Sequence, residues 1–528
     1  MSSVVKLSSM ADLLRSPVRA DAAVTSRPAS LGAAALILGG VGLGLAFPVA
    51  PLPGVDPVAL WPLAWFALFP LLSAIRSSKS LPDVLWSTIY FGTAWFLTSA
   101  SWLFGMFDSL AWVFVAMWIA WLTLFSVTAR LTLRAGLSPW LVWPILWIAC
   151  EYLRSECSPF RLDLLTGQPD SIRMSWYVLG HSRVSAPWMA QTASLWGGYG
   201  LSLLPFLCNF FIADLWDQRR VSRLGISVVF LVFLLELCYS MEKWLASPAE
   251  EGPVRVGVVQ SERYSLDAKL NLMVPLLKID PEVDLIVWPE CSWRESPGDV
   301  ERICAFAAEH KKTIVAACDR IDPGEIWRNV AYWITPAGLG GAYYKIERVP
   351  LFDRHQAGQE YPVFTLAAGK QQVRVGIVIC YDLDFPTHIR KITAGGAQII
   401  SIPTMDMGAW GGTQHAQHAL LSRLRAIENR VPIVQANSSG MSQIIDARGQ
   451  ILARLPYDVE RRPECANFYS EGTASASMLP RPIQSVSHYT SWGYRLAPIT
   501  ALTAFLLVLV ASFRLAMGVG RTSSPENV

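Results

Sequence analysis

Eight stretches of this 528-residue chain carry almost no charge, and they limit what the chain can fold into more than any other feature. Crossing the hydrocarbon core of a bilayer takes roughly 20 apolar residues in a helix. The stretches have or approach that length, and they are 28–55, 57–75, 84–107, 109–129, 135–150, 184–213, 224–243 and 496–513. Eight transmembrane helices explain so many runs better than the buried helices of a water-soluble core.

The composition agrees with a membrane protein. Hydrophobic residues make up 52% of the chain and charged residues 16%, whereas an average soluble domain is about 25% charged. The formal net charge of +3 leaves no strongly basic surface of the kind that indicates a nucleic-acid partner. The nine cysteines include no C-x-x-C pair, so the sequence indicates neither a disulfide framework nor a zinc ribbon.

Lys and Arg residues occur in alternate connections between these runs, and positive connections mark the cytoplasmic side of a membrane. The first 27 residues lack the short apolar core and cleavage site of a signal peptide. The sequence therefore predicts cytoplasmic tails, seven helices in a first membrane domain, an extracytoplasmic domain and an eighth helix. Their expected bounds are 1–27 and 518–528 for the tails, 28–243 for the membrane domain, 244–495 for the extracytoplasmic domain and 496–517 for the last helix.

The long insert has a different pattern, in which short β-branched runs alternate with polar stretches of helical periodicity. Such alternation predicts one layered α/β domain. Helices are expected over 298–310 and 414–429. Strands are expected over 254–260, 284–290, 313–319, 373–382, 397–404, 431–437 and 442–446.

Two of these predicted strands end in reactive side chains, Glu290 and Cys380. Open α/β sheets bind their ligands at the carboxyl ends of strands. A lone cysteine is more often a small buried hydrophobe than a nucleophile. Glu290, however, can act as a general base, and Lys345 can supply the positive charge that a thiolate or an oxyanion requires. The three residues together make a candidate site for nucleophilic catalysis.

In this order the three segments resemble the nitrilase, or carbon-nitrogen hydrolase, superfamily, which uses a Glu-Lys-Cys triad. The matching motifs are Trp288-Pro289-Glu290, Lys345 to Pro350 and Cys380-Tyr381-Asp382. With seven spans before this domain and one after it, the chain resembles the apolipoprotein N-acyltransferases. The segments 151–154 and 191–202 are similar to motifs of that family's membrane half, although close helix packing also explains the glycines of the second segment.

This resemblance implies a polytopic α-helical membrane bundle of eight spans plus a nitrilase-like α-β-β-α sandwich. It also implies an acyltransferase of lipoprotein maturation whose catalytic residues are Glu290, Lys345 and Cys380. A membrane phospholipid would give its acyl chain to Cys380 as a thioester. The α-amino group of a diacylglyceryl-cysteine on an apolipoprotein would then accept the chain. The resemblance implies no metal or organic cofactor, and it places the catalytic domain on the periplasmic face of the bacterial cytoplasmic (inner) membrane.

The sequence departs from the family pattern at a few positions. Asp353 stands eight residues after Lys345, where the family commonly has a glutamate, and Asp382 stands where many relatives have one. Asp353 is expected to support the lysine, but it can also be a surface carboxylate that pairs with an arginine. Tyr381 is expected to pack against the turn that carries the nucleophile. Lys269 is followed by leucine, where relatives often have tryptophan.

The remaining predictions concern two histidines of the α/β domain and two alternative functions of the protein. His415 and His418 lie i,i+3 on a predicted helix and could suggest a metal pair. With no third ligand in view, we expect a solvated helix start near the mouth of the pocket, and His355 has no assigned role. The alternative functions are a membrane-tethered nitrilase-like amidase, in which water is the acceptor, and a non-catalytic membrane scaffold that has kept the fold.

Overall fold

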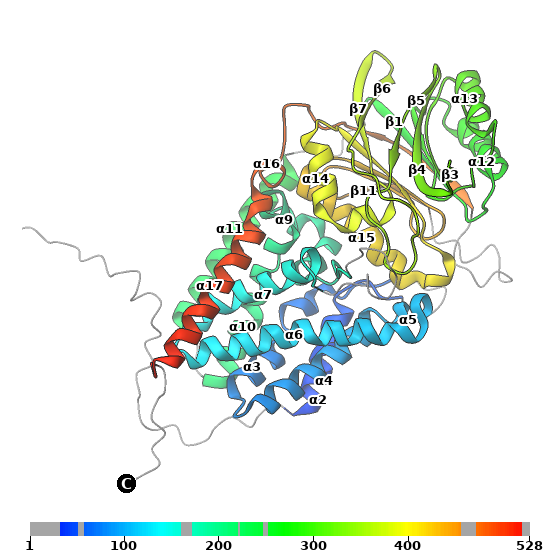
Figure 1. Ribbon diagram of the computed structural model, residues 1–528. Helices are drawn as coiled ribbons and strands as arrows, with labels where there is room; N and C mark the ends of the chain where they lie inside the picture. Colours follow the sequence, from blue (N-terminus) through cyan, green and yellow to red (C-terminus); the bar gives the residue numbers. More distant parts are fainter. Residues whose placement is uncertain are drawn as a thin grey trace, which may run out of the picture.

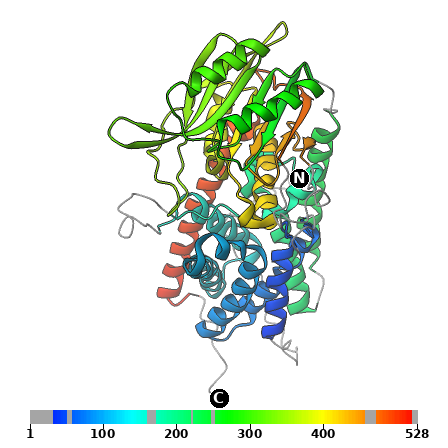
Figure 2. The same cartoon turned by 90° about the vertical axis from the view of Figure 1, so that its right-hand side faces the viewer.

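The computed structural model describes residues 32–50, 57–159, 172–219, 222–246, 252–455 and 471–519. A helical half and a mixed α/β half lie end to end (Figure 1). The view turned by 90° shows the α/β half stacked on one end of the helices (Figure 2). The predicted tail 1–27 and all but the first two residues of the tail 518–528 lie outside the described residues.

The helical half contains α-helices in every one of the eight charge-free runs. Short 3-10 turns join several of them, among them η1 (Trp61–Trp65) and η3 (Leu179–Ser185). The helices are α2 (Ala33–Leu45), α3 (Phe69–Ser77), α4 (Leu81–Ser99), α5 (Trp102–Phe107), α6 (Ala111–Arg134), α7 (Pro139–Glu156), α9 (Ala193–Gly200), α10 (Leu203–Gln218), α11 (Arg223–Leu245) and α17 (Leu496–Ala516).

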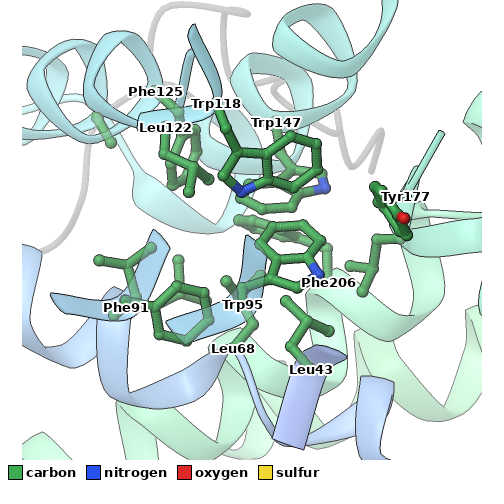
Figure 3. Close-up of a cluster of buried hydrophobic side chains, with 14 of the residues drawn as sticks. Leu43, Leu68, Phe91, Trp95, Trp118, Leu122, Phe125, Trp147, Tyr177 and Phe206 are labelled. Carbon is green, nitrogen blue, oxygen red and sulfur yellow. The ribbon is translucent and has the colours of Figure 1, made fainter. Parts of the chain in front are cut away.

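Aromatic side chains fill the centre of this half (Figure 3). Trp95 packs edge-on against Trp118 with ring centroids 4.7 Å apart, and Phe125 packs edge-on against Trp147 at 5.0 Å. Each such aromatic pair adds about 0.5–1.5 kcal/mol beyond the burial of its surface. Helix α2 approaches α4 closely because Gly40 has no side chain, and a Cβ there would lie 2.3 Å from a backbone oxygen of α4.

Three described helical segments are long and apolar enough to cross a membrane. They are Trp102–Arg134, Gly225–Leu245 and Gly493–Ala516. The pair Ala193–Gly200 and Leu203–Gln218 makes a fourth if the two helices, bent by 53°, count as one span. These helices support a membrane protein, whereas the count of eight spans stays a prediction.

The α/β half contains two six-stranded sheets. Strand order is β12-β1-β2-β3-β4-β5 in the first sheet and β11-β10-β9-β8-β7-β6 in the second. Strands β1, β2 and β3 pair in parallel, as do β7, β8 and β9, and the outer pairs are antiparallel. The bounds are β1 Val254–Gln260, β2 Leu285–Val287, β3 Thr313–Asp322, β4 Ile326–Thr335, β5 Gly338–Tyr344, β6 Val363–Ala368, β7 Gln371–Ile377, β8 Ile399–Thr404, β9 Ile433–Asn437, β10 Gln443–Ile445, β11 Ile451–Arg454 and β12 Gly472–Met478.

The two sheets pack face to face, and helices cover their outer faces. Helices α12 (Leu266–Ile279) and α13 (Asp299–His310) lie on the first sheet, and α14 (Pro386–Ala394) and α15 (Gly411–Asn429) lie on the second. This is the expected α-β-β-α sandwich. Helix α15 also contacts α9 and η3 of the helical half (Figure 1), so it lies between the two halves of the molecule.

The expected strands all occur, although several are shorter than predicted. The parallel strands were recognisable because strands buried on both faces form continuous β-branched runs. The sequence did not predict the β4–β5 hairpin, the edge strands β6 and β11, or β12. The predicted strand 373–382 ends at Ile377, because the chain turns into the 3-10 segment η5 (Cys380–Asp384).

Candidate active site

Glu290 lies at the centre of a set of polar contacts. Glu290 follows β2 and is 1% exposed. Its Oε1 accepts hydrogen bonds from Asn329 Nδ2 at 2.7 Å and from Lys345 Nζ at 2.8 Å, and its Oε2 accepts one from the backbone N–H of Met405 at 3.0 Å. Donors from three separate segments therefore hold the carboxylate in one orientation.

Lys345 follows β5, and its ammonium lies between two carboxylates. Its Nζ is 2.8 Å from Glu290 Oε1 and 2.7 Å from Asp353 Oδ2. Burial alone would lower the pKa of Lys345, but Asp353 and Glu290 outweigh that effect and raise this pKa well above its usual value. The lysine is therefore a fixed positive charge. Asp353 lies against this lysine and is largely buried, so the surface alternative for it is wrong.

Cys380 begins η5 with a backbone φ of 46°. Non-glycine residues seldom adopt this left-handed conformation, which costs about 1–3 kcal/mol and is found most often at functional sites. The Cys380 Sγ lies 3.9 Å from the carbonyl oxygen of Met405. Burial and the nearby charge of Glu290 raise the pKa of the Cys380 thiol well above its usual value. The resting side chain is therefore a thiol, and it needs a base before it can attack.

Glu290 has the properties of that base. Burial raises the pKa of its carboxyl above the usual value, although the charge of Lys345 and a hydrogen bond with the Cys380 side chain oppose the shift. A carboxylate with a raised pKa is a better proton acceptor near neutral pH. The arrangement can therefore move a proton from the thiol to the carboxylate beside a fixed ammonium.

Asp382 ties the turn of the nucleophile to the chain that follows Lys345. Its Oδ1 accepts hydrogen bonds from the backbone N–H groups of Glu347 at 2.7 Å and Ile346 at 3.2 Å. Its Oδ2 accepts one from the hydroxyl group of Tyr343 at 2.7 Å. Asp382 is 0% exposed, so it acts through the backbone positions that it holds.

The catalytic candidates share one cavity with the helical half, here named the apolar cavity. Glu290, Lys345 and Cys380 line it, together with Asp353 and Tyr381. Apolar side chains of α5, α6 and the segment after residue 171 also line it, and they include Trp102, Met106, Phe107, Phe114, Trp118 and Met174. The candidate chemistry therefore faces walls that the predicted membrane domain supplies.

The two histidines of α15 are not solvated as predicted, although the expected place of this helix beside the pocket is confirmed, since His418 lines the apolar cavity. His415 and His418 are 0% and 3% exposed, because the helical half covers this helix. His418 Nδ1 lies 2.9 Å from Asp406 Oδ1, and its Nε2 lies 3.4 Å from Asp384 Oδ1. Burial opposes protonation, but the two carboxylates raise the pKa of His418 to about 10. Among the described residues, no group of three or more His, Cys, Asp or Glu side chains is placed to hold a metal ion.

Sequence reasoning missed three contacts of the site. Asn329 lies in strand β4, which the sequence did not predict. The feature of the sequence that could have identified this residue is its amide side chain directly before the apolar run 330–334. The N–H of Met405 is a backbone donor, which no side chain reveals. Trp176 comes from the helical half and donates its indole N–H to Asp384. The last contact depends on how the two halves pack, so the local sequence does not show it.

Family models match both halves of the chain. Residues 39–211 match the apolipoprotein N-acyltransferase N-terminal domain, and residues 255–461 match the carbon-nitrogen hydrolase model. Both halves of the chain are thus similar to the corresponding parts of apolipoprotein N-acyltransferases. These matches confirm the resemblance that the motifs around Glu290, Lys345 and Cys380 indicated.

Named apolipoprotein N-acyltransferases align with this chain over most of their length. The apolipoprotein N-acyltransferase of Geobacter metallireducens is 29% identical over 476 residues, which cover 80% of this chain and 86% of that protein. The apolipoprotein N-acyltransferase of Gloeobacter violaceus is 25% identical over 527 residues, which cover 90% and 93%. Among solved structures, Saccharomyces cerevisiae Nit3, of the nitrilase superfamily, is similar with a TM-score of 0.36 and 19% identity, and the match covers 42% of this chain and 90% of that one.

Proposed function

We propose that this protein is an N-acyltransferase of lipoprotein maturation. It moves an acyl chain from a membrane phospholipid, through a thioester on Cys380, to the α-amino group of the diacylglyceryl-cysteine that begins an apolipoprotein. The names of the similar proteins support this reaction class. The observation that carries the proposal is the shared cavity, in which Cys380, Glu290 and Lys345 face apolar walls from the helical half.

In the first half-reaction, Glu290 takes the proton of Cys380, and the thiolate attacks the ester carbonyl of the phospholipid. Lys345 and the backbone N–H near Tyr381 stabilise the negative oxygen that forms. The carbon–oxygen bond of the ester then breaks, and the proton passes from Glu290 to the departing lysophospholipid alcohol. The products are a thioester on Cys380 and a lysophospholipid, as in other two-step covalent mechanisms.

In the second half-reaction, the neutral α-amino group of the apolipoprotein attacks the thioester carbonyl. A carbon–nitrogen bond forms and the carbon–sulfur bond breaks. Glu290 takes the proton that the nitrogen loses and returns it to the Cys380 sulfur. The apolar walls support this order, because a thioester survives only where water is excluded.

The membrane part of the proposal follows from the substrates. Each buried methylene group holds a lipid in the bilayer by about 0.8 kcal/mol, so the active site must lie at the membrane. We therefore propose the predicted arrangement of eight spans in the inner membrane, with seven in 28–243 and the last in 496–517. The catalytic domain 244–495 then lies on the periplasmic face, and the tails 1–27 and 518–528 lie in the cytoplasm.

The decisive assay supplies purified protein in mixed micelles with a phospholipid and a diacylated lipopeptide. The expected products are a lysophospholipid and a lipopeptide that is heavier by one acyl group in amide linkage, as mass spectrometry of both species shows. Free fatty acid with an unchanged lipopeptide would instead identify a hydrolase. An absence of turnover from correctly folded protein would favour the scaffold alternative.

The orientation has a test of its own. Lys311 is an exposed residue at the end of α13, so Lys311→Cys places a thiol on the surface of the catalytic domain. A reagent that does not cross the inner membrane should label this variant in cells whose outer membrane has been permeabilised. Labelling only after lysis would contradict the proposed topology.

A further inference from the structure

A second cavity adjoins the apolar cavity, and we name it the polar cavity. Its volume is about 630 Å³. It shares four lining residues with the apolar cavity, namely Glu290, Phe352, Asp353 and Met405. All its other lining residues come from the α/β half, and those used below are Glu262, Asp319, Asn329 and His355. The Glu290 carboxylate therefore borders both a hydrocarbon-like space and a polar one.

Two buried polar atoms of this cavity have no partner within the part of the chain that the structure describes. Asn329 is 3% exposed, and it donates through Nδ2 to Glu290, which leaves its Oδ1 unpaired. His355 is 6% exposed. Its Nδ1 lies 3.9 Å from Asp353 Oδ2, and its Nε2 has no hydrogen-bond partner among the described residues. An unsatisfied buried polar atom costs about 1–3 kcal/mol, so a ligand that pairs with both atoms gains that free energy.

Both unpaired atoms can form a hydrogen bond with a ligand. Burial lowers the pKa of His355 to about 4, so the ring is neutral at pH 7. The neutral ring accepts through Nε2 in the tautomer that carries its proton on Nδ1. The carbonyl oxygen of Asn329 is also an acceptor. Glu262 and Asp319, whose charges Lys345 does not neutralise, add two carboxylate acceptors beside two guanidinium groups. The cavity therefore favours a ligand that donates N–H groups.

We propose that the polar cavity binds the amino-terminal end of the acceptor peptide, through its amino group and its first backbone N–H groups. This inference rests on the proposed function and adds the place of the acceptor. The acyl chain occupies the apolar cavity, and the amine reaches the thioester where the two cavities meet, at Glu290. The carbon–nitrogen bond forms as the carbon–sulfur bond breaks, and the proton of the amine passes through Glu290 to the Cys380 sulfur.

The test separates the two half-reactions. Asp319→Asn and Glu262→Gln each remove one negative charge while keeping the size of the side chain. Among the described residues, no hydrogen bond or ion pair joins Asp319 or Glu262 to the three catalytic candidates. Charge-assisted hydrogen bonds contribute about 1.5–3 kcal/mol, and 1.4 kcal/mol is a factor of ten. We therefore expect the double variant to raise the KM for a diacylated lipopeptide by about tenfold or more.

Release of lysophospholipid in the absence of acceptor should keep its parental rate in the same double variant. Asp267→Asn is the matched control, because Asp267 lies on α12 outside both cavities, and it should change neither quantity. If the double variant melts at a lower temperature than the parent, the same two measurements are made with Glu262→Gln alone.

Two results would overturn the acceptor site. One is a parental KM in the folded variant, and the other is an equal loss in both half-reactions, which would report damage to the catalytic cluster. A lipopeptide with a methylated second backbone nitrogen adds an independent probe. It should bind the parent more weakly and should lose little further affinity in Asp319→Asn. If the parent protein releases no lysophospholipid at all, the proposed function itself is wrong.

Discussion

The ammonium of Lys345 lies 2.8 Å from Oε1 of Glu290, and neither side chain is more than 2% exposed. Each ion of a buried pair loses several kcal/mol of hydration free energy, and the attraction between the two close charges must offset that loss. A change to one partner therefore leaves the other as an uncompensated buried charge. The cluster therefore behaves as one unit.

Replacement of the nucleophile should abolish acyl transfer. Cys380→Ser keeps the shape of the side chain, but a hydroxyl group ionises far less readily than a thiol. A loss of roughly 10⁶-fold is the scale that hydrolases show without their nucleophile. The measurement is the burst of lysophospholipid and the mass of the acylated protein. Cys304→Ser, in α13 and outside both cavities, is the control, and a burst from Cys380→Ser equal to that of the control would refute the assignment.

Removal of the base should slow acylation without removing the thiol. Glu290→Gln keeps an oxygen for Lys345 but takes away the proton acceptor, and a general base typically contributes about 10²–10⁴-fold. Single-turnover acylation by a phospholipid measures this loss. A small thiol reagent should still label Cys380 in the variant at high pH. Acylation at the parental rate would show that another group takes the proton.

The charge of Asp353 should set the pH dependence of acylation. The negative charge of Asp353 contributes to the raised pKa of Glu290, so Asp353→Asn should lower that pKa. The carboxylate form would then exist at lower pH, and the acid limb of the rate profile should move toward lower pH. Asp353→Glu restores the charge and should return the limb to its parental position. A shift toward higher pH in Asp353→Asn would contradict this electrostatic reading.

His418 should make stability depend on pH in the alkaline range. Its pKa is raised from 6.5 to about 10 in the folded state. A raised pKa of this kind stabilises the fold fully below pH 6.5, and the contribution is lost as the pH rises toward 10. His418→Gln should cost on the order of 3 kcal/mol near neutral pH, because it leaves two buried carboxylates without their cation.

Thermal melting of the parent and of His418→Gln from pH 6 to pH 10 measures this contribution. The difference between their melting temperatures should narrow as the pH rises. His310→Gln, at the end of α13 and far from this network, should show a small difference that does not depend on pH. A constant difference for His418→Gln would mean that the imidazole contributes through its shape alone.

Much of the α/β half was predictable from the sequence because its central strands are buried on both faces. Their buried stretches are then mostly apolar, as in Leu285–Val287 and in residues 375–379, and Glu290 and Cys380 follow these two stretches. The edge strands were not predictable in the same way. Strand β12, with the sequence Gly-Thr-Ala-Ser-Ala-Ser-Met, has few β-branched or bulky residues, and it forms a strand because β1 supplies partners along its full length.

The burial of His415 and His418 was not predictable for a different reason. A helix with charged and polar residues normally turns them toward water. Here the helical half covers α15, and the partners of His418, which are Asp384 and Asp406, lie far from it in the sequence or beyond a turn. Local periodicity contains no information about such partners. The same limit applies to the contact of Trp176 with Asp384.

The pairing of β1 with β12 has a consequence for how such a protein can arise. Val254 on the strand that enters the α/β half lies opposite Met478 on the strand that leaves it. The two ends of the inserted sequence therefore emerge side by side from the finished domain. Close chain ends of this kind make a domain tolerable as an insertion, here between α11 and α17.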